Sequence, residues 1–322
     1  MLVALGLIAL GFVFLIFGAD LTVKGGVAIA NKLNIAPVII GLTILAFGTS
    51  APEFVVSIKA ALNDAEGIVL GNIIGSNIGN IFLILGLASA IKPIEADKKV
   101  FFRDYKFLLA VTILFAVISY FGNFSLLHGL LMLALLFGFI AFNYVNAMKN
   151  PPEENNEETH SPYASKSWLI VSLVTIAGLV AIIFGGDLLV KGAVSIAEHL
   201  GVSQEIIGLT IIAFGTSLPE LAVSVIAAMR GQSAMALGNV VGSNIWNIVF
   251  IMGITATMTN VEVPQQFIVY DNIVMLAGTL ILWPIMMTKG KISRTEGIVM
   301  FIAYCAYIVS QVLITQGVIN FG

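Results

Sequence analysis

Long apolar stretches separated by short polar ones dominate the pattern of this chain. An α-helix needs about 20 mainly apolar residues to cross the hydrocarbon core of a bilayer. Ten stretches come close to this length, although Gly, Pro, Ser or Asn interrupt several of them. They are 2–19, 36–61, 67–90, 106–121, 125–146, 167–185, 204–229, 235–257, 267–287 and 296–317. The pattern predicts an all-α polytopic membrane protein with ten transmembrane helices.

The chain also repeats itself. Residues 11–86 align without a gap on 178–253, at a constant offset of 167, and more than half of the aligned positions are identical. IIGLTILAFGTSAPE at 39–53 matches IIGLTIIAFGTSLPE, and LGNIIGSNIGNI at 70–81 matches LGNVVGSNIWNI. Apolar helices match by chance at Leu, Ile and Val, but not at Gly, Thr, Ser, Pro, Glu and Asn in one register. The repeat therefore indicates an internal duplication.

The number of spans in each half determines how the halves enter the membrane. Five is odd, so the second half enters in the opposite orientation. Inverted repeats of this kind give one scaffold two related conformations, which is the structural basis of alternating access in many transporters. We expect a first inverted repeat at 1–149, a cytoplasmic linker at 150–166 and a second inverted repeat at 167–322.

Composition excludes several other classes of protein. Hydrophobic residues make up 59% of the chain and charged residues 10%, against about 25% charged in soluble domains. The single cysteine excludes a disulfide framework and a cysteine-cluster metal site. A net charge of −3 without a basic stripe argues against nucleic acid. The chain predicts contact with membrane lipid, no cofactor and no evident protein partner.

The distribution of Lys and Arg predicts the orientation. The loops after the odd-numbered spans hold most of them, and the other side holds only Lys59 and Lys191. The positive-inside rule places the richer side in the cytoplasm. We therefore expect a multi-pass protein of the cell membrane with both termini outside.

Two glutamates fall midway along apolar spans, Glu53 in the second and Glu220 in the seventh. A carboxylate at this depth costs at least ~2.5 kcal/mol on insertion scales, so it needs a partner or a function. No basic residue lies at the same depth. A structural glutamate hydrogen-bonded between helices is one reading, and a ligand for a cation from solution is the favoured one.

The residues around the glutamates are suited to hard cations. Each glutamate follows a Gly-Thr-Ser-x-Pro segment, and a proline inside a helix leaves the carbonyl four residues back without its donor. Carbonyl, hydroxyl and carboxylate oxygens bind Na⁺ and Ca²⁺ in preference to zinc or copper. In the next span, Ser76 and Asn80 share a helix face because they are four residues apart, and Ser243 and Asn247 do likewise. For Asn77 and Asn244, helix–helix hydrogen bonding is as good an expectation as ligation.

These paired GTSxPE and GSNxxN segments resemble the two α-repeats of the calcium/cation antiporter superfamily, in its prokaryotic Na⁺/Ca²⁺ exchanger branch. The resemblance spans essentially the whole chain. It implies that Glu53 and Glu220 are central ligands shared by Ca²⁺ and Na⁺, with Asn80 and Asn247 flanking the middle. By the same resemblance, the Thr49 and Thr216 carbonyls serve Ca²⁺. One Na⁺ site is lined by Ala46, Thr49, Ser50, Ser76 and Glu220, and its twin by Ala213, Thr216, Ser217, Ser243 and Glu53.

The resemblance implies a secondary active antiporter that exchanges Na⁺ for Ca²⁺ by alternating access and is electrogenic. K⁺-dependent members have Asp where this chain has Asn247, so we expect no K⁺ requirement. A Ca²⁺/H⁺ antiporter of the same fold, using both glutamates as proton carriers, stays open. A passive cation channel is a remote alternative. An enzyme is not expected, because Ser50 and Ser217 have no nearby base.

Overall fold

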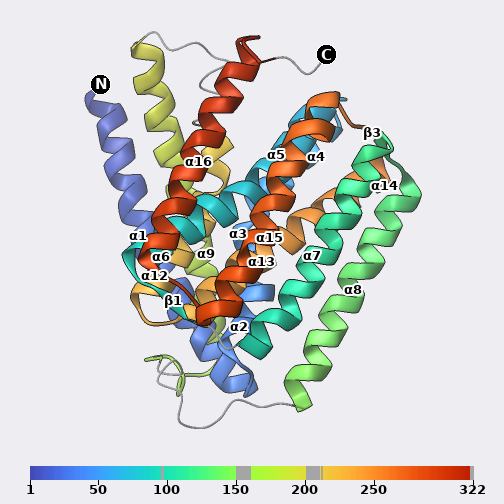
Figure 1. Ribbon diagram of the computed structural model, residues 1–322. Helices are drawn as coiled ribbons and strands as arrows, with labels where there is room; N and C mark the ends of the chain where they lie inside the picture. Colours follow the sequence, from blue (N-terminus) through green and yellow to red (C-terminus); the bar gives the residue numbers. More distant parts are fainter. Residues whose placement is uncertain (96–97, 150–160, 201–210, 212, 320–322) are drawn as a thin grey trace.

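A computed structural model describes residues 1–95, 98–149, 161–200, 211 and 213–319, without the side chains of 99, 100, 213 and 289. The chain forms a bundle of long helices with two short β-ladders (Figure 1). Within the described residues, seven helices are long and apolar enough to cross a membrane, and eight if one bent pair counts as a single span. The described part is therefore that of a multi-pass membrane protein.

The described residues of the first half form eight α-helices, two π-helical segments, η1 and η2, and two strands. Their bounds are α1 Leu2–Leu33, α2 Pro37–Ile40, η1 Gly41–Leu45, α3 Ala46–Thr49, α4 Ala51–Ala61, α5 Glu66–Ile78, η2 Gly79–Leu85, α6 Gly86–Ile91, β1 Ile94–Glu95, α7 Lys98–Tyr120, β2 Asn123–Phe124 and α8 Leu126–Lys149.

As far as it is described, the second half repeats this order of elements, except that the π-helical segment η6 precedes α15 and has no counterpart before α7. Their bounds are α9 Trp168–His199, α11 Ala213–Thr216, α12 Leu218–Met229, α13 Ser233–Ile245, η5 Trp246–Ile251, α14 Met252–Met258, β3 Val261–Glu262, η6 Phe267–Asp271, α15 Asn272–Lys289, β4 Lys291–Ile292 and α16 Arg294–Thr315.

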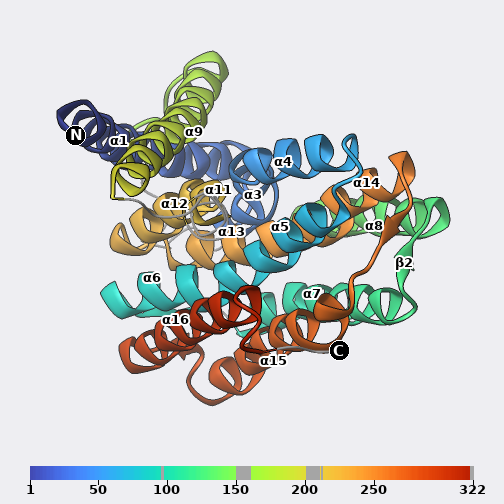
Figure 2. The same cartoon turned by 90° about the horizontal axis from the view of Figure 1, so that it is seen from above.

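Helices α5 and α13, with their continuations, form the centre of the bundle. The most apolar window of Glu66–Ile91 is 78% buried and that of Ser233–Met258 is 83% buried, whereas the window of Arg294–Thr315 is 17% buried. Seen from above, α1 and α9 lie along one side of this centre and α15 and α16 along the other (Figure 2). The outer helices therefore face lipid, and the two central helices form the core in which polar groups are shielded.

The long helices α1 and α9 cross in antiparallel directions along a line of glycines. A Cβ built at Gly11 would lie 2.8 Å from the Gly185 carbonyl oxygen, and one at Gly18 would lie 2.9 Å from that of Gly178. The two contacts are equivalent in the repeat, because Gly178 lies 167 residues after Gly11 and Gly185 lies 167 residues after Gly18. Because lipid provides little hydrophobic drive for helix association, close backbone packing of small residues holds such pairs together.

Proline and serine interrupt the second predicted span. Pro37–Thr49 and Ala51–Ala61 are bent by 46° relative to each other. Ser50 lies at the break, with φ −79° and ψ 7°, and Pro52 occupies the first turn of α4. A proline fits there because the first amides of a helix have no intrahelical acceptor. The break therefore places a helix C-terminus and a helix N-terminus inside the bundle.

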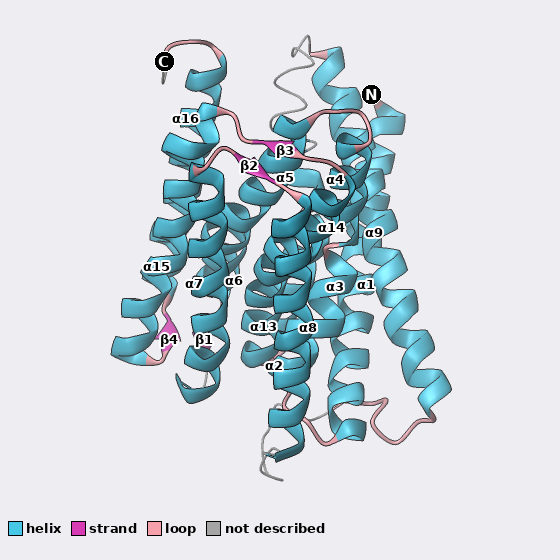
Figure 3. Ribbon diagram, turned by 90° about the vertical axis from the view of Figure 1, so that its right-hand side faces the viewer, coloured by secondary structure: helices cyan, strands magenta, loops and turns pink. Residues whose placement is uncertain are grey.

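Two short antiparallel ladders close the ends of the bundle. Ile94 pairs with Ile292, and Phe124 pairs with Val261. The β1–β4 ladder lies at one end and the β2–β3 ladder at the other (Figure 3). Each ladder joins one strand from either half of the chain, so the two halves are tied together at both ends.

The structure modifies several of the expected boundaries. The first and sixth spans continue as single helices to Leu33 and His199, well beyond the predicted ends at 19 and 185. The span predicted at 204–229 and the linker at 150–166 fall partly outside the described residues. Within the linker, the Ser161 hydroxyl donates to the Lys24 carbonyl of α1 (2.7 Å). The N-terminus and the end of α16 lie at the same end of the bundle (Figure 1).

The α1–α9 contact gives a stability prediction. Gly18→Val places methyl groups against the α9 backbone, and we expect a loss of about 1–3 kcal/mol of unfolding free energy. Gly6→Val is the matched control on the same helix, because a Cβ there meets nothing within 4 Å. Thermal unfolding in detergent measures both variants. Equal unfolding midpoints for the two would contradict close packing along this line.

Candidate functional site

The interrupted helices position both glutamates. Glu53 lies in the first turn of α4 and Glu220 in the first turn of α12. Ser217 has nearly the same backbone conformation as Ser50, with φ −87° and ψ 4°. A helix N-terminus carries partial positive charge and stabilises a carboxylate in its first turn. The two breaks therefore make a carboxylate tolerable in the interior of the bundle.

Each glutamate accepts a hydrogen bond from a serine in the other half of the chain. The Ser50 hydroxyl donates to Glu220 Oε1 (2.8 Å), and the Ser217 hydroxyl donates to Glu53 Oε1 (3.1 Å). Glu53 and Glu220 are each 1% exposed and repel one another electrostatically. Four of the predicted site residues are thus brought together at the meeting point of α4 and α12.

The predicted serines of the central helices join this cluster. Ser243 donates to Glu220 Oε1 (3.4 Å), and the Ser217 hydroxyl lies 3.5 Å from that of Ser76. Both central serines are buried. Each therefore contributes a hydroxyl oxygen on the side of the cluster that faces α5 or α13.

Four asparagines link the central helices to each other. Asn80 Nδ2 donates to Asn244 Oδ1 (2.9 Å), and Asn247 Nδ2 donates to Asn77 Oδ1 (3.3 Å). The offset of 167 again converts one bond into the other. Asn77 and Asn244 therefore form hydrogen bonds between helices, which was one of their two expected roles. They accept from the side-chain nitrogens of Asn80 and Asn247, so the side-chain oxygens of these two residues remain available to bind an ion.

Within the part of the chain that the structure describes, four buried oxygens of the predicted ligands have no hydrogen-bond partner. They are Glu53 Oε2, Glu220 Oε2, Asn80 Oδ1 and Asn247 Oδ1. Buried polar atoms are nearly always paired, and a group left unpaired calls for an explanation such as an ion. The four atoms come from the four elements α4, α12, η2 and η5 and form two pairs related by the repeat. This arrangement is suited to a cation bound among them.

The donor set determines which cations fit. Among the described residues no group of three His, Cys, Asp or Glu side chains could hold a metal, and no basic side chain forms an ion pair with either glutamate. Two carboxylates with amide and hydroxyl oxygens are hard ligands of total charge −2. Such a set favours Ca²⁺ and Na⁺ over transition metals.

The remaining predicted ligands differ in how they are placed. Thr49 is fully buried, and its hydroxyl lies 3.4 Å from both the Ala46 carbonyl and Asn239 Oδ1. The Ala46 carbonyl also accepts from the Ser50 amide (3.0 Å), so the break does not leave it without a partner. Thr216 is partly exposed. The side chain of Ala213 is outside the described residues.

Two asparagines that support the site were not predicted. Asn72 Nδ2 donates to the Glu53 carbonyl (2.9 Å) and to the Ser57 hydroxyl (2.8 Å). Asn239 Nδ2 donates to Ser224 (3.1 Å), which is the equivalent contact in the second half. Both asparagines occur in the repeated Leu-Gly-Asn segments, so the signal was present in the sequence. They fix each interrupted helix against its central helix.

An aromatic cluster breaks the symmetry next to Ser50. Phe47, Phe54, Trp246 and Phe250 line a cavity of about 40 Å³ beside its hydroxyl. Trp246 Nε1 donates to the Leu42 carbonyl (3.0 Å) and its ring lies 5.0 Å from that of Phe47. The equivalent of Trp246 in the first half is Gly79, so the indole that covers this side of the cluster has no counterpart at the matching position of η2.

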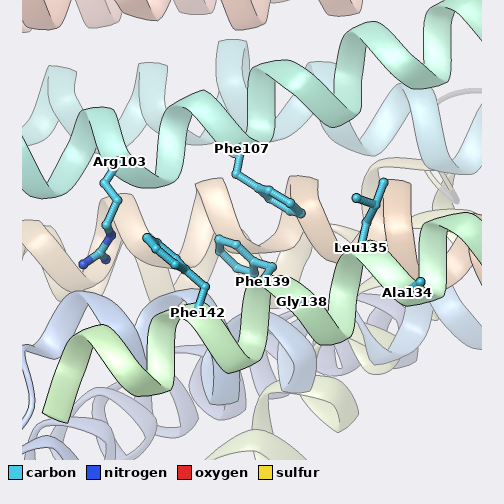
Figure 4. Close-up of a pocket in the computed structure, with 7 residues that line it drawn as sticks. All are labelled: Arg103, Phe107, Ala134, Leu135, Gly138, Phe139 and Phe142. Carbon is cyan, nitrogen blue, oxygen red and sulfur yellow. The ribbon is translucent and has the colours of Figure 1, made fainter.

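A larger cavity of about 290 Å³ lies between α7 and α8. Figure 4 shows that Phe107, Phe139 and Phe142 point into it and that Arg103 lies at one end. None of the predicted ligands lines it, and its walls are almost wholly apolar. It is therefore separate from the polar cluster.

Acidic and basic residues four positions apart form ion pairs on α1 and α9. Asp20 pairs with Lys24 (2.7 Å) and Asp187 with Lys191 (2.6 Å). Asp20 also pairs with Arg230 at the end of α12, a contact the sequence did not predict. These pairs lie outside the glutamate cluster; because α1 extends to Leu33 and α9 to His199, the two pairs on these helices lie within the helices and not at their ends.

Comparison with known families agrees with this geometry. The family model described as "Sodium/calcium exchanger protein" matches residues 3–145 and 170–313. The sodium/calcium exchanger MaX1 of Methanosarcina acetivorans is 35% identical, over 94% of this chain and 97% of that protein. The inner membrane protein YrbG of Escherichia coli is 31% identical, over 87% and 88%.

A solved structure has a similar fold. The sodium-calcium exchanger NCX_Mj, soaked with Na⁺ and Sr²⁺, superimposes with a TM-score of 0.83. The two sequences are 34% identical, and the match covers 96% of this chain and 98% of that one. The likeness therefore extends over both halves of the chain.

The two facing carboxylates give a prediction of unusual sign. In the absence of cations, Glu53→Gln should leave the unfolding midpoint unchanged or raise it, because one of two repelling buried charges is removed. In the wild type, Ca²⁺ at a concentration of about 100 times its Kd should raise the free energy of unfolding by about 2.7 kcal/mol. The variant should not show this increase. Glu66→Gln is the control and should behave as the wild type. A variant that keeps the full Ca²⁺ gain would exclude Glu53 as a ligand.

Proposed function

The chain belongs to the sodium/calcium exchanger protein family, and from this membership we propose that it is a secondary active antiporter that exchanges Na⁺ for Ca²⁺. The family consists of membrane ion transporters, not enzymes. The observation that carries the proposal is the set of four unpaired buried oxygens on Glu53, Glu220, Asn80 and Asn247.

Exchange follows from the sharing of two carboxylates. One Ca²⁺ balances the charge of Glu53 and Glu220, and several Na⁺ in adjacent subsites can do the same. If both ions need the same oxygens, they cannot be carried together. Each half-cycle then moves one kind of ion. With three Na⁺ for each Ca²⁺, one net charge would cross the membrane in every cycle.

The Na⁺ subsites use the neutral oxygens beside the shared carboxylates. One comprises Ser50, Ser76 and Glu220 with the Ala46 and Thr49 carbonyls, and its twin Ser217, Ser243 and Glu53 with those of Ala213 and Thr216. The crossed bonds from Ser50 to Glu220 and from Ser217 to Glu53 support this arrangement. A serine hydroxyl that donates to a carboxylate can rotate and present its oxygen to an ion.

The architecture we propose is ten helices in two inverted five-helix repeats, at 1–149 and 167–322, joined by a cytoplasmic linker at 150–166. Antiparallel crossing of α1 and α9 and the interchange of contacts by the offset of 167 support it. In this arrangement both termini are outside the cell and the ends rich in Lys and Arg are cytoplasmic. Alternating access would follow from the two equivalent positions of the repeats.

A Ca²⁺/H⁺ antiporter is the second candidate, and one observation favours it. Each glutamate retains a buried oxygen that a proton can occupy in place of a cation. Such an exchanger would use the same carboxylates but would not need the hydroxyl subsites.

Transport into proteoliposomes distinguishes these functions. We expect radioactive Ca²⁺ uptake when the vesicles contain Na⁺, and none when they contain K⁺ or choline. Uptake should be insensitive to external K⁺, and at three Na⁺ for each Ca²⁺ it should carry one net positive charge out of the vesicle per cycle. The E53Q/E220Q double variant should abolish it, because no carboxylate remains to balance Ca²⁺.

The opposite results are equally clear. Uptake driven by a pH gradient and indifferent to Na⁺ would identify a proton-coupled exchanger. Ca²⁺ flux that needs no counter-ion would identify a channel. K⁺-stimulated uptake would contradict the role expected from an uncharged Asn247.

A further inference from the structure

A third buried carboxylate lies on the membrane-spanning helices, away from the two glutamates. Asp271 ends η6 and is 1% exposed. Its Oδ1 accepts from the Tyr307 hydroxyl (2.9 Å) and from Gln311 Nε2 (2.5 Å), and its Oδ2 accepts from Gln266 Nε2 (3.2 Å). All three donors are neutral. None of the proposed ion ligands touches it.

The repeat shows what is unusual about this carboxylate. Asp104 occupies the equivalent position in the first half and is also buried, at 3% exposure. Its oxygens accept from Arg103 Nε (2.8 Å) and Nη2 (2.6 Å), so it is neutralised by a neighbouring cation. Tyr270 replaces that arginine in the second half. Asp271 therefore has the same burial without the compensating charge.

The groups packed around Asp271 supply no cation. On α16, Tyr307 contacts it and Tyr304 packs beside Tyr307, while Tyr270 of η6 stacks on the Tyr307 ring. On α7, the Tyr105 hydroxyl donates to the Thr279 carbonyl, two turns along α15. Among the described residues, no basic side chain pairs with Asp271.

A short chain of contacts leads from α15, the helix that follows Asp271, to the proposed ion site. Met275 lies one turn after Asp271 on α15, and its sulfur accepts from Asn77 Nδ2 (3.6 Å). Asn77 in turn accepts from Asn247. On the neighbouring helix, Tyr304 packs at Gly79, next to Asn80. Met275 and Asn77, which lie between Asp271 and the ion ligands, are both buried, and Coulomb forces between charges buried in a protein are only weakly screened.

We propose that Asp271 is a proton-binding site that adjusts the cation affinity of the exchanger. A proton from the solution at the end of the bundle with the two termini binds Oδ2, which accepts only one hydrogen bond, and forms a neutral carboxylic acid. The ionised form attracts cations toward Glu53 and Glu220, and the protonated form does not. Buried membrane carboxylates without a counter-charge commonly serve proton binding. This inference goes beyond Na⁺/Ca²⁺ exchange, and the exchange itself does not require Asp271.

The test compares Asp271→Asn with the wild type in proteoliposomes, with the pH varied on the side of the termini. The neutral asparagine should raise the KM for Ca²⁺ at alkaline pH by roughly 3–10-fold, leave Na⁺-driven uptake at saturating Ca²⁺ intact, and reduce the further rise of KM on acidification. Glu262→Gln, an exposed acid at the same end, is the control and should match the wild type. A D271N variant with the wild-type KM and pH profile would overturn the proposal.

Two further measurements test the proposal, and the first of them does not depend on the folding of D271N. Tyr307→Phe removes one donor to the ionised carboxylate, so the midpoint of the KM–pH profile should move to higher pH. An unchanged midpoint would count against Asp271. Infrared difference spectra on acidification should contain a carboxylic-acid band that is absent in D271N, and a band retained in D271N would assign the proton elsewhere. If the wild type itself showed no Na⁺-driven uptake, that result would instead count against the proposed function.

Discussion

The structure depends on two carboxylates that are buried among helices and that have no basic partner among the described residues. Burying one charge in such a place is costly, and burying two that repel each other is more so. The interrupted helices reduce this cost by directing their N-termini at Glu53 and Glu220. They do not neutralise the charge, and the remaining imbalance is what a cation from solution can supply. The residues around the glutamates are consistent with that need, since each provides an oxygen or orients one.

The repeat makes the site from two equivalent halves, and its departures from symmetry give the two sides different properties. Crossed bonds between the serines and glutamates and between the asparagines are interchanged by one offset. Two pairs of equivalent positions break this symmetry: Trp246 corresponds to Gly79, and Arg103 corresponds to Tyr270. The first adds an apolar cover near Ser50. The second leaves Asp271 without a cation. Symmetry therefore accounts for the shared ligands, and its local loss accounts for features found on one side only.

Much of this arrangement was predictable because the repeated motifs are polar within apolar spans. Both glutamates, the serines beside them and Asn80 with Asn247 could be identified from that contrast alone. Pro52 predicted a weakened helix inside the span expected at 36–61, but the break at Ser50, with Pro52 in the first turn of a new helix, was not predicted. The repeated Leu-Gly-Asn segments mark Asn72 and Asn239, but their role could not be predicted, because an asparagine that holds two helices together and one that binds an ion give the same repeated pattern. Arg230 and Asp271 were missed because their partners lie far away in sequence, on helices whose packing the pattern does not fix.

The central claim is that Na⁺ and Ca²⁺ occupy the same carboxylates. Calorimetric titration of Ca²⁺ into the purified protein at a series of Na⁺ concentrations tests it most directly. The account predicts that the apparent Kd for Ca²⁺ rises with Na⁺ without saturating, and more steeply than in proportion, because several Na⁺ replace one Ca²⁺. An apparent Kd that is independent of Na⁺, or that reaches a plateau, would mean that the ions bind at separate sites and would contradict exchange through shared ligands.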